Sequence, residues 1–410
     1  MKKNAFLTVL GAMSLFLIFI SCISAYAAQA SVPSIKIGYL GPLTGPAADD
    51  GKRMLDGAQV AFDEVNREVA GRKIELFIED DEFNPGVGVA KLKRLYYDKG
   101  IKILIGVENS AVALALRDFY HANKIPFVAS MAQVASLTRE KFSPYFFRAA
   151  SCSNTQSAPF HAYVAYQRGY RKLVIATSDF VTGRDNAAGF KMIFERMGGK
   201  VVQQVYTPLG TMDYSSYLAK MFTQDTDGVY AFYFGADAVR FVKQYAEYGY
   251  KGKTHIISDG AMFNEGYLDA EGDAALGHES VYGYSEALDT PANREFKKAY
   301  WSKYGQGKRI SVYDEMGYVS AKAVIKALQA VKGNAEDPDA FVAALEKVQF
   351  EAPRGGVFKF DKYHNPYYKH YLLRVEKIGG VLQRVVLKEY PAVAQDWFLD
   401  SEVLRQLGIK

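Results

Sequence analysis

The sequence predicts an α/β protein of two doubly wound parallel-sheet lobes, joined by a hinge that the chain crosses several times. From residue 35 onward, short β-rich apolar runs alternate with segments of helical periodicity, which is typical of parallel sheets covered by helices. This alternation restarts after Ser151. The chain has 410 residues, 49% of them hydrophobic, which is enough apolar material for more than one core.

The first lobe is expected to hold five strands with helices between them. Asn84 and Pro85 predict a helix start, because Asn caps free N–H groups and Pro lacks the N–H that the first helical position leaves unpaired. Gly100 is placed to end that helix. The expected strands cover residues 36–40, 74–78, 101–105, 126–129 and 145–148, and the other helices cover residues 55–65 and 111–122.

The second lobe is expected to repeat this pattern and to be followed by a strand-rich tail. Its predicted strands cover residues 173–177, 201–206, 229–234 and 254–257, with a helix over 184–197. One more strand (281–285) and helices at 292–304, 313–331 and 338–348 follow, then antiparallel strands at 357–360, 371–375 and 385–388.

The tail is too short to bury itself, so we expect it to return to an existing lobe and make both lobes discontinuous. The predicted division is residues 31–149 with 279–350 for the first lobe, 150–278 with 351–396 for the second, and 397–410 as a C-terminal tail.

The N-terminus predicts export. Lys2 and Lys3 precede an uncharged apolar stretch, and small residues with Ala-x-Ala cleavage options follow at 25–30. These features are typical of a secretory signal peptide over residues 1–30. The apolar run of about 16 residues is shorter than the roughly 20 that span a bilayer. A periplasmic location is therefore expected.

The two cysteines leave one alternative open. Cys22 ends the run Phe19-Ile20-Ser21-Cys22, which is similar to a lipoprotein cleavage box except that Phe19 stands where Leu is usual. A lipid anchor at Cys22 is thus the alternative to plain cleavage near residue 27 or 30. With plain cleavage Cys152 is the only cysteine left, and no disulfide framework is possible.

The sequence lacks the motifs of several classes of protein function. The sequence has no nucleophile elbow, zinc-protease helix or phosphate-binding loop, so no enzyme activity and no cofactor are expected. The net charge of +5 includes Lys2 and Lys3, and the remaining charges of both signs are interspersed. No nucleic-acid partner is predicted.

The segments that follow four predicted strands carry polar groups. In open α/β sheets, ligands bind at the carboxyl ends of the strands, where loops and helix N-termini present N–H groups. Hydroxyl and N–H groups in the first lobe suit a carboxylate, and an acid in the second lobe suits an ammonium group. The four segments are residues 106–110, 129–133, 177–183 and 257–260.

Four motifs occur in order along the chain. They are Ile37-Gly38-Tyr39-Leu40-Gly41-Pro42-Leu43-Thr44-Gly45-Pro46, Glu79-Asp80-Asp81 with Asn84-Pro85, Ile105-Gly106 with Ser110, and Phe147-Arg148. In their order and spacing, the chain resembles the leucine/isoleucine/valine-binding protein family of bacterial ABC importers, with the type I periplasmic binding fold. The similarity runs from about residue 34 to about residue 388.

The resemblance implies a function and a set of ligand-binding residues. Two lobes would close on an amino acid or similar small organic acid, and a membrane permease of an ABC importer would be the partner. Ser110 falls on the family's carboxylate-binding serine, Asp259 on the acid that receives the ammonium, and Met131 on a main-chain contact. The implied ligand-binding residues are Asp50, Glu108, Asn109, Ser110, Ser130, Met131, Ala132, Gln133, Phe180, Thr182, Gly235 and Asp259.

The chain departs from the family pattern at three of these positions. Gln133 stands where Thr is usual, Thr182 where a Tyr packs over the ligand, and Asp50 where an aromatic residue is common. These departures predict a more polar pocket, whereas Phe180 and Met131 could equally line a slot for an aromatic carboxylate. The ligand class therefore stays open between the two.

Other interpretations of the same residues remain. Ser110 and Asp50 are also good helix caps, and Asp259 beside Gly260 suits a turn. Arg148 is expected to brace the boundary between the lobes. The alternative function is a ligand-sensing receptor module of the same fold.

Overall fold

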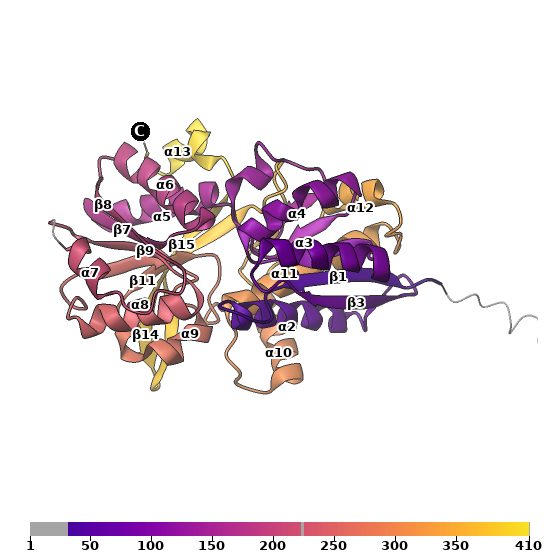
Figure 1. Cartoon of the computed structure of the whole chain (residues 1–410), viewed down its shortest axis with the longest axis horizontal. Helices are drawn as coiled ribbons and strands as arrows, with labels where there is room; N and C mark the ends of the chain where they lie inside the picture. The colour runs from indigo at the N-terminus through magenta and orange to yellow at the C-terminus, as the bar shows by residue number, and fades with distance from the viewer. Residues whose placement is uncertain (1–31, 223–224, 410) are drawn as a thin grey trace, which may run out of the picture.

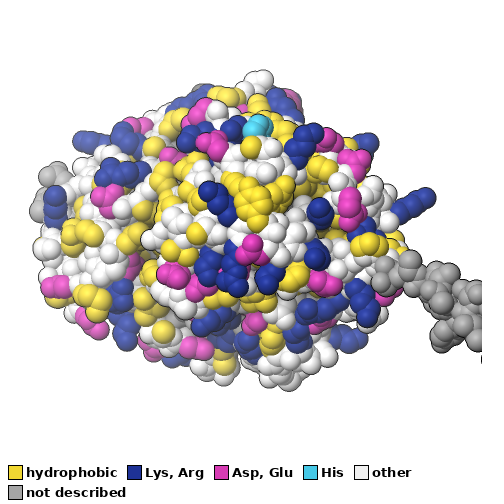
Figure 2. All heavy atoms as spheres, turned by 45° about the vertical axis from the view of Figure 1, so that its right-hand side comes forward, with side chains coloured by type: hydrophobic (Ala, Val, Ile, Leu, Met, Phe, Trp, Pro, Cys, Tyr) yellow, Lys and Arg dark blue, Asp and Glu magenta, His cyan; other side chains and the backbone are white. Residues whose placement is uncertain are grey.

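Two α/β lobes lie side by side in the computed structural model, which describes residues 32–222 and 225–409 (Figure 1). The expected signal peptide and Cys22 lie outside the described residues. On the face shown in Figure 2, Lys and Arg side chains lie among Asp and Glu side chains.

The first lobe is built on a six-stranded sheet whose order is β2-β3-β1-β4-β5-β6. All pairs in it are parallel except the short β2–β3 ladder. The five strands expected from the sequence are confirmed. The strands are β1 (Ile35–Gly41), β2 (Glu68–Val69), β3 (Arg72–Asp80), β4 (Ile103–Gly106), β5 (Phe127–Ala129) and β6 (Phe146–Arg148).

Helices from two separate parts of the chain cover this sheet. The predicted start at Asn84 is confirmed, since its side chain accepts hydrogen bonds from the N–H groups of Gly86 and Val87. The predicted end at Gly100 is also confirmed, with φ of 69° at that residue. The helices are α2 (Ala48–Glu64), α3 (Pro85–Arg94), the π-helix η1 (Leu95–Lys99), α4 (Ser110–Ala122), α10 (Pro291–Tyr304), α11 (Val312–Ala330) and α12 (Pro338–Leu345).

The second lobe has a mixed sheet of order β15-β14-β11-β10-β9-β7-β8. Strands β7 to β11 are parallel, and the two tail strands β14 and β15 are antiparallel, as expected. The strands are β7 (Lys172–Ser178), β8 (Lys200–Thr207), β9 (Gly228–Phe232), β10 (His255–Asp259), β11 (Glu279–Tyr282), β14 (Tyr368–Ile378) and β15 (Val381–Val393).

Nine helical segments and a two-stranded ladder complete the described part of the chain. The helical segments are η2 (Ala135–Thr138), α5 (Asn154–Gln167), α6 (Val181–Arg196), α7 (Ser215–Met221), α8 (Gly235–Glu247), α9 (Glu265–Glu271), η3 (Gly272–Ala275), η4 (Trp397–Leu399) and α13 (Ser401–Gln406). The ladder pairs β12 (Phe350–Glu351) with β13 (Val357–Phe358), so the strand expected over 357–360 is short and joins neither large sheet.

Three sequence-based boundaries are corrected. Strand β11 belongs to the second sheet, because it pairs with β10 and β14, whereas residues 279–350 were assigned to the first lobe. Strand β9 ends at Phe232, because Phe234 becomes the N-cap residue of α8. The predicted C-terminal tail, residues 397–410, belongs to the second lobe, since Trp397 is buried against Phe160 of that lobe, with ring centroids 5.4 Å apart.

The chain crosses between the lobes after β6, after β11 and before β14. Arg148, at the first crossing, is fully buried. Its guanidinium donates to the carbonyls of Ala132 and Val134, both at 2.8 Å, and to the side chain of Asn365 at the third crossing. The expected role of Arg148 as a brace at the lobe boundary is confirmed.

Candidate ligand-binding site

A pocket lies between the lobes, where loops at the carboxyl ends of the strands meet. The first lobe contributes the loops after β3, β4 and β5, and the second lobe those after β7, β9 and β10. Its lining residues are Phe83, Glu108, Asn109, Ser110, Met131, Gln133, Phe180, Thr182, Phe232, Phe234 and Ala261.

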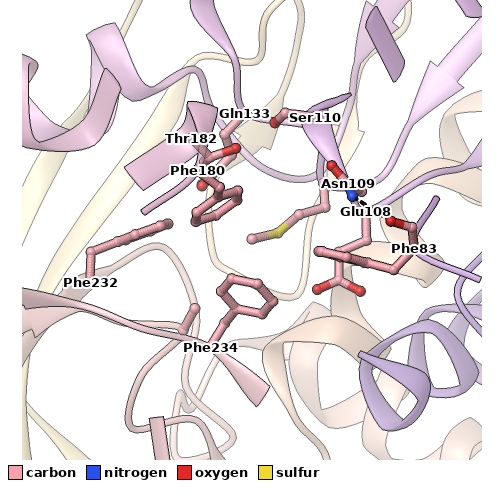
Figure 3. A pocket seen from close by; sticks show the side chains of 11 residues that line it. Phe83, Glu108, Asn109, Ser110, Gln133, Phe180, Thr182, Phe232 and Phe234 are labelled. Carbon is pink, nitrogen blue, oxygen red and sulfur yellow. Dashed lines mark hydrogen bonds between the residues drawn. The ribbon is translucent and has the colours of Figure 1, made fainter. Parts of the chain in front are cut away.

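One end of the pocket gathers polar groups from both lobes: Ser110, Gln133 and Thr182 (Figure 3). The Ser110 side chain accepts a hydrogen bond from the N–H of Val134 at 3.2 Å, which leaves its own hydroxyl hydrogen free to donate. The amide of Gln133 is buried, and neither its oxygen nor its nitrogen has a hydrogen-bond partner among the described residues. This end can therefore donate several hydrogen bonds to a ligand.

Two helix N-termini point toward the same end. Helix α4 begins at Ser110, and helix α6 begins at Val181. The N-cap residue of α6, Phe180, makes no side-chain cap, so the first-turn N–H groups lack that partner. Helix N-termini carry a partial positive charge and favour anions, which makes this end suited to a carboxylate.

Aromatic rings form the walls of the pocket. Phe180 and Phe234 of the second lobe have ring centroids 5.3 Å apart, and Phe180 stacks on Phe232 at 6.3 Å. The ring centroid of Phe83, in the first lobe, lies 5.7 Å from that of Phe234. Figure 3 shows these rings around a common space. Aromatic side chains in such arrangements make large apolar contacts with a flat ligand.

Glu108 lies beside Phe83, apart from Gln133, Ser110 and Thr182 (Figure 3). Its side chain is 6% exposed, and Oε2 has no hydrogen-bond partner in the described part of the chain. Burial, together with the negative charges of Asp50 and Asp81, raises the pKa of Glu108 well above its usual value. Burial therefore favours the neutral form of this carboxyl group, which can both donate and accept a hydrogen bond.

Asp50 and Gly235, which were predicted to contact the ligand, lie instead where the lobes touch. The hydroxyl of Tyr267 on α9 donates to the carboxylate of Asp50 on α2, and the N–H of Gly235 donates to that hydroxyl at 3.0 Å. Burial raises the pKa of Asp50 to about 7, against the opposing effect of the Tyr267 hydrogen bond. With the Phe83–Phe234 contact, this arrangement marks a closed conformation of the two lobes.

Asp259 does not line the pocket. Its Oδ1 accepts the N–H of Ala261 at 2.9 Å, which is the turn geometry that the sequence offered as its alternative role. Its Oδ2 lies 3.9 Å from Nε2 of His161, and no described residue hydrogen-bonds to it. Burial raises the pKa of Asp259 to about 7 and lowers that of His161 to about 3.

The predicted site residues thus divide into two groups. Ser130 and Ala132 hold backbone structure, since the Ser130 N–H donates to Gly106 and the Ala132 carbonyl accepts from Arg148. Outside the pocket lining are Asp50, Ser130, Ala132, Gly235 and Asp259, and within it are Glu108, Asn109, Ser110, Met131, Gln133, Phe180 and Thr182.

Sequence reasoning missed four lining residues: Phe83, Phe232, Phe234 and Ala261. Ala261 lies one residue beyond the predicted strand-end segment 257–260. Phe232 and Phe234 belong to an apolar run that was predicted as a strand over 229–234, and such a run has the same pattern in a core and in an apolar pocket. Phe83 lies between the predicted strand and Asn84, next to a motif that the sequence did identify.

Comparisons with known proteins agree with this architecture. The model of the periplasmic binding protein family matches residues 34–380. A Leu/Ile/Val-binding protein homolog 6 from Brucella melitensis biotype 1 is 29% identical over 360 residues, 87% of this chain and 88% of the relative.

Two solved structures superpose closely. An ABC transporter substrate-binding protein from Sphaerobacter thermophilus has a TM-score of 0.83 and 33% identity, covering 89% of this chain and 99% of that one. An ABC transporter solute-binding protein from Rhodopseudomonas palustris HaA2, solved in complex with p-hydroxybenzoic acid, has a TM-score of 0.84 and 31% identity, with the same coverage.

Within residues 32–222 and 225–409, no helix combines the length and apolarity needed to cross a membrane. The fold has the two α/β lobes and the interlobe pocket that the resemblance implied, and the family match covers most of the sequence. The chain belongs to the leucine/isoleucine/valine-binding branch of the periplasmic binding proteins, the extracytoplasmic solute-binding proteins of ABC transporters.

Proposed function

We propose that this protein captures an aromatic carboxylate between its lobes and presents it to the permease of an ABC importer. The observation that supports this most directly is the composition of the pocket. Four phenylalanine rings surround a space that ends in the side chains of Ser110, Gln133 and Thr182. A flat apolar ring with one anionic group fits both features.

The carboxylate is assigned to the Ser110 end. There the free hydroxyl of Ser110, the unpaired amide nitrogen of Gln133 and the N-termini of α4 and α6 supply donors. Hydrogen bonds to an ionised acceptor are stronger than neutral ones. Binding a carboxylate there would also give the buried Gln133 amide a partner, whose absence otherwise destabilises the site.

The ring is assigned to the space between Phe83 and the phenylalanines of the second lobe. The p-hydroxybenzoic acid bound by the Rhodopseudomonas palustris relative is of the same chemical class. An amino acid is the second candidate, favoured by Glu108, since this is the one acid in the pocket lining that could face an ammonium group. Asp259, the acid that the resemblance implied for that role, does not line the pocket.

Capture proceeds by closure of the lobes. A ligand that contacts both lobes binds the closed form better than the open form and shifts the population toward it. Ser110 and Gln133 belong to the first lobe, and Phe180, Thr182 and Phe234 to the second, so one ligand bridges the two. The closed shape is then the form that the permease recognises, and no bond in the ligand is made or broken.

Isothermal titration of the exported protein tests this proposal. Benzoate and hydroxybenzoates should bind with heat and should be recovered unchanged by mass spectrometry, whereas leucine and phenylalanine should not bind. Gln133→Ala should weaken aromatic acids about tenfold or more, and Gln306→Ala, at an exposed position, should leave binding unchanged. Binding of leucine without binding of any aromatic acid would instead support the amino acid as ligand, and turnover of the ligand would indicate an enzyme.

We further propose that residues 1–30 are a signal peptide that is removed on export to the periplasm. N-terminal sequencing of the exported protein should give a start near residue 28 or 31. A lipid-modified N-terminus at Cys22 would establish the alternative, a membrane-anchored form. Co-purification with a permease rather than with a signalling protein separates the transport function from the sensory one.

A further inference from the structure

Glu108 is the one ionisable side chain among the described residues that line the pocket. It belongs to the loop after β4, two residues before the start of α4. The carboxylate-binding groups, Ser110, Gln133 and Thr182, lie apart from it in Figure 3, and Phe83 lies beside it. A ligand whose carboxylate faces Gln133 can therefore place another part of its ring near Glu108.

The carboxyl group of Glu108 has unused hydrogen-bonding capacity. Oε2 is buried and lacks a hydrogen-bond partner within the described chain, and no ion pair to Glu108 is found there either. The neighbouring residue Asn109 is occupied, since its side chain donates to the carbonyl of Phe83 and accepts from the N–H of Ala111. Of the polar groups at this end of the pocket, Glu108 is thus the one that can serve a ligand.

The surroundings of Glu108 restrict what that ligand group can be. Two further acids, Asp50 and Asp81, raise the pKa of Glu108, and no cation of the described residues pairs with Glu108, so a second carboxylate on the ligand is disfavoured. An apolar substituent would leave Oε2 buried without a partner, which is unfavourable. A hydroxyl group can both donate to and accept from a carboxyl group, and it adds no charge.

We propose that Glu108 selects a hydroxylated aromatic acid, by pairing its carboxyl group with a ring hydroxyl at the 3- or 4-position. This inference rests on the proposed function, because it takes the carboxylate of the ligand to be bound at the Ser110 end. Sites built to hydrogen-bond a ligand hydroxyl discriminate strongly against the analogue that lacks it. Glu108 is then a specificity-determining residue of the same pocket.

The experiment compares matched ligands on the exported wild-type protein by isothermal titration. Benzoate, 3-hydroxybenzoate, 4-hydroxybenzoate and 4-fluorobenzoate share the ring and the carboxylate. At least one hydroxybenzoate should bind ten or more times tighter than benzoate, and 4-fluorobenzoate, which cannot donate a hydrogen bond, should not gain this advantage. Equal affinity for all four ligands overturns the role of Glu108 and leaves the aromatic acid as ligand.

Two variants assign the preference to this side chain. Glu108→Leu should lose the hydroxybenzoate preference, so that benzoate and the hydroxybenzoates bind with similar affinity. Glu108→Gln, which keeps a donor and an acceptor, should retain part of that preference and also serves if the leucine variant does not fold. A preference that survives unchanged in Glu108→Gln and Glu108→Leu places the hydroxyl-binding group elsewhere, and a failure of every aromatic acid to bind wild type contradicts the proposed function itself.

Discussion

The Tyr267 hydroxyl, on the second lobe, donates a hydrogen bond to the carboxylate of Asp50 on the first. Both side chains are buried, and the same hydroxyl receives the N–H of Gly235. The two residues are 217 positions apart in the sequence. Opening of the lobes would separate α2 from α9 and break this hydrogen bond. The Asp50–Tyr267 bond therefore stabilises the closed form relative to the open one.

Tyr267→Phe should therefore weaken ligand binding. A buried hydrogen bond to a carboxylate contributes roughly 1.5–3 kcal/mol, so we expect the Kd to rise about tenfold through a shift toward the open form. Isothermal titration gives the Kd, and small-angle X-ray scattering of the unliganded protein should show a larger radius of gyration.

A matched control lies within the first lobe. Tyr300 donates to Asp314 at 2.7 Å, and both residues are fully buried. Tyr300→Phe should lower the free energy of unfolding without changing the Kd. If both variants weaken binding equally, the Tyr267–Asp50 bond has no special part in closure.

Gly235 gives a second, steric prediction about closure. Its φ is 55°, and an added Cβ would lie 2.9 Å from the carbonyl oxygen of Pro46 in the first lobe. Gly235→Ala should therefore prevent full closure and weaken ligand binding by tenfold or more. Gly272 has a φ of 59° but no atom within 4 Å of an added Cβ, so Gly272→Ala places an alanine at positive φ without the clash. Equal Kd values for the two variants would contradict the steric argument.

Local signals were enough to predict much of the fold from the sequence. The helix after Asn84 and the strands of both sheets follow from capping, periodicity and apolar runs, which act over a few residues. Strand-end loops likewise identified Ser110 and Gln133 as candidate site residues. These features depend little on contacts with residues that are distant in the sequence.

The sequence could not show features that depend on contacts between distant segments. In the sequence, Asp50 is a polar residue near a helix start, whether it contacts a ligand or the other lobe. Only the packing of α9 against α2 brings Tyr267 to it. The assignment of β11 to the wrong lobe has the same cause. Strand β11 pairs with β10 on one side and on the other with β14, which is distant in the sequence. Phe232 and Phe234 have a core-like pattern, and the position of the pocket alone separates them from core residues.

Arg384 and Glu265 form a buried ion pair that holds the loop after β10. Their side chains are 0% and 1% exposed, with Nη2 and Oε2 2.6 Å apart, and Arg384 also donates to the carbonyl of Gly260. Arg384→Met would leave Glu265 buried and unpaired, which costs about 3–5 kcal/mol of unfolding free energy. Urea unfolding measures the loss. Arg405→Met, which breaks an exposed pair with Glu402, should leave the transition unchanged within error.

Asp80 and Asp81 are adjacent, yet their environments shift their pKa values in opposite directions. Asp81 is fully buried, its Oδ2 has no partner in the described residues, and burial raises its pKa to about 7. For Asp80, burial also acts upward, but hydrogen bonds from the Thr44 hydroxyl and from backbone N–H groups prevail and lower the pKa.

The pH dependence of stability should follow from these shifts. Between about pH 4 and pH 7 the folded state keeps the Asp81 proton that the unfolded state has released, so this group makes the free energy of unfolding fall as the pH rises. Asp81→Asn removes that fall. The free energy of unfolding of the variant minus that of wild type should therefore be larger at pH 8 than at pH 4, by on the order of 2–4 kcal/mol. Asp80→Asn should do the reverse: it should be less stable than wild type at pH 7, and the difference should close as the pH drops below about 4. Urea unfolding midpoints between pH 3 and pH 8 measure both, and parallel pH profiles for wild type and Asp81→Asn would show that Asp81 is not protonated in the folded protein.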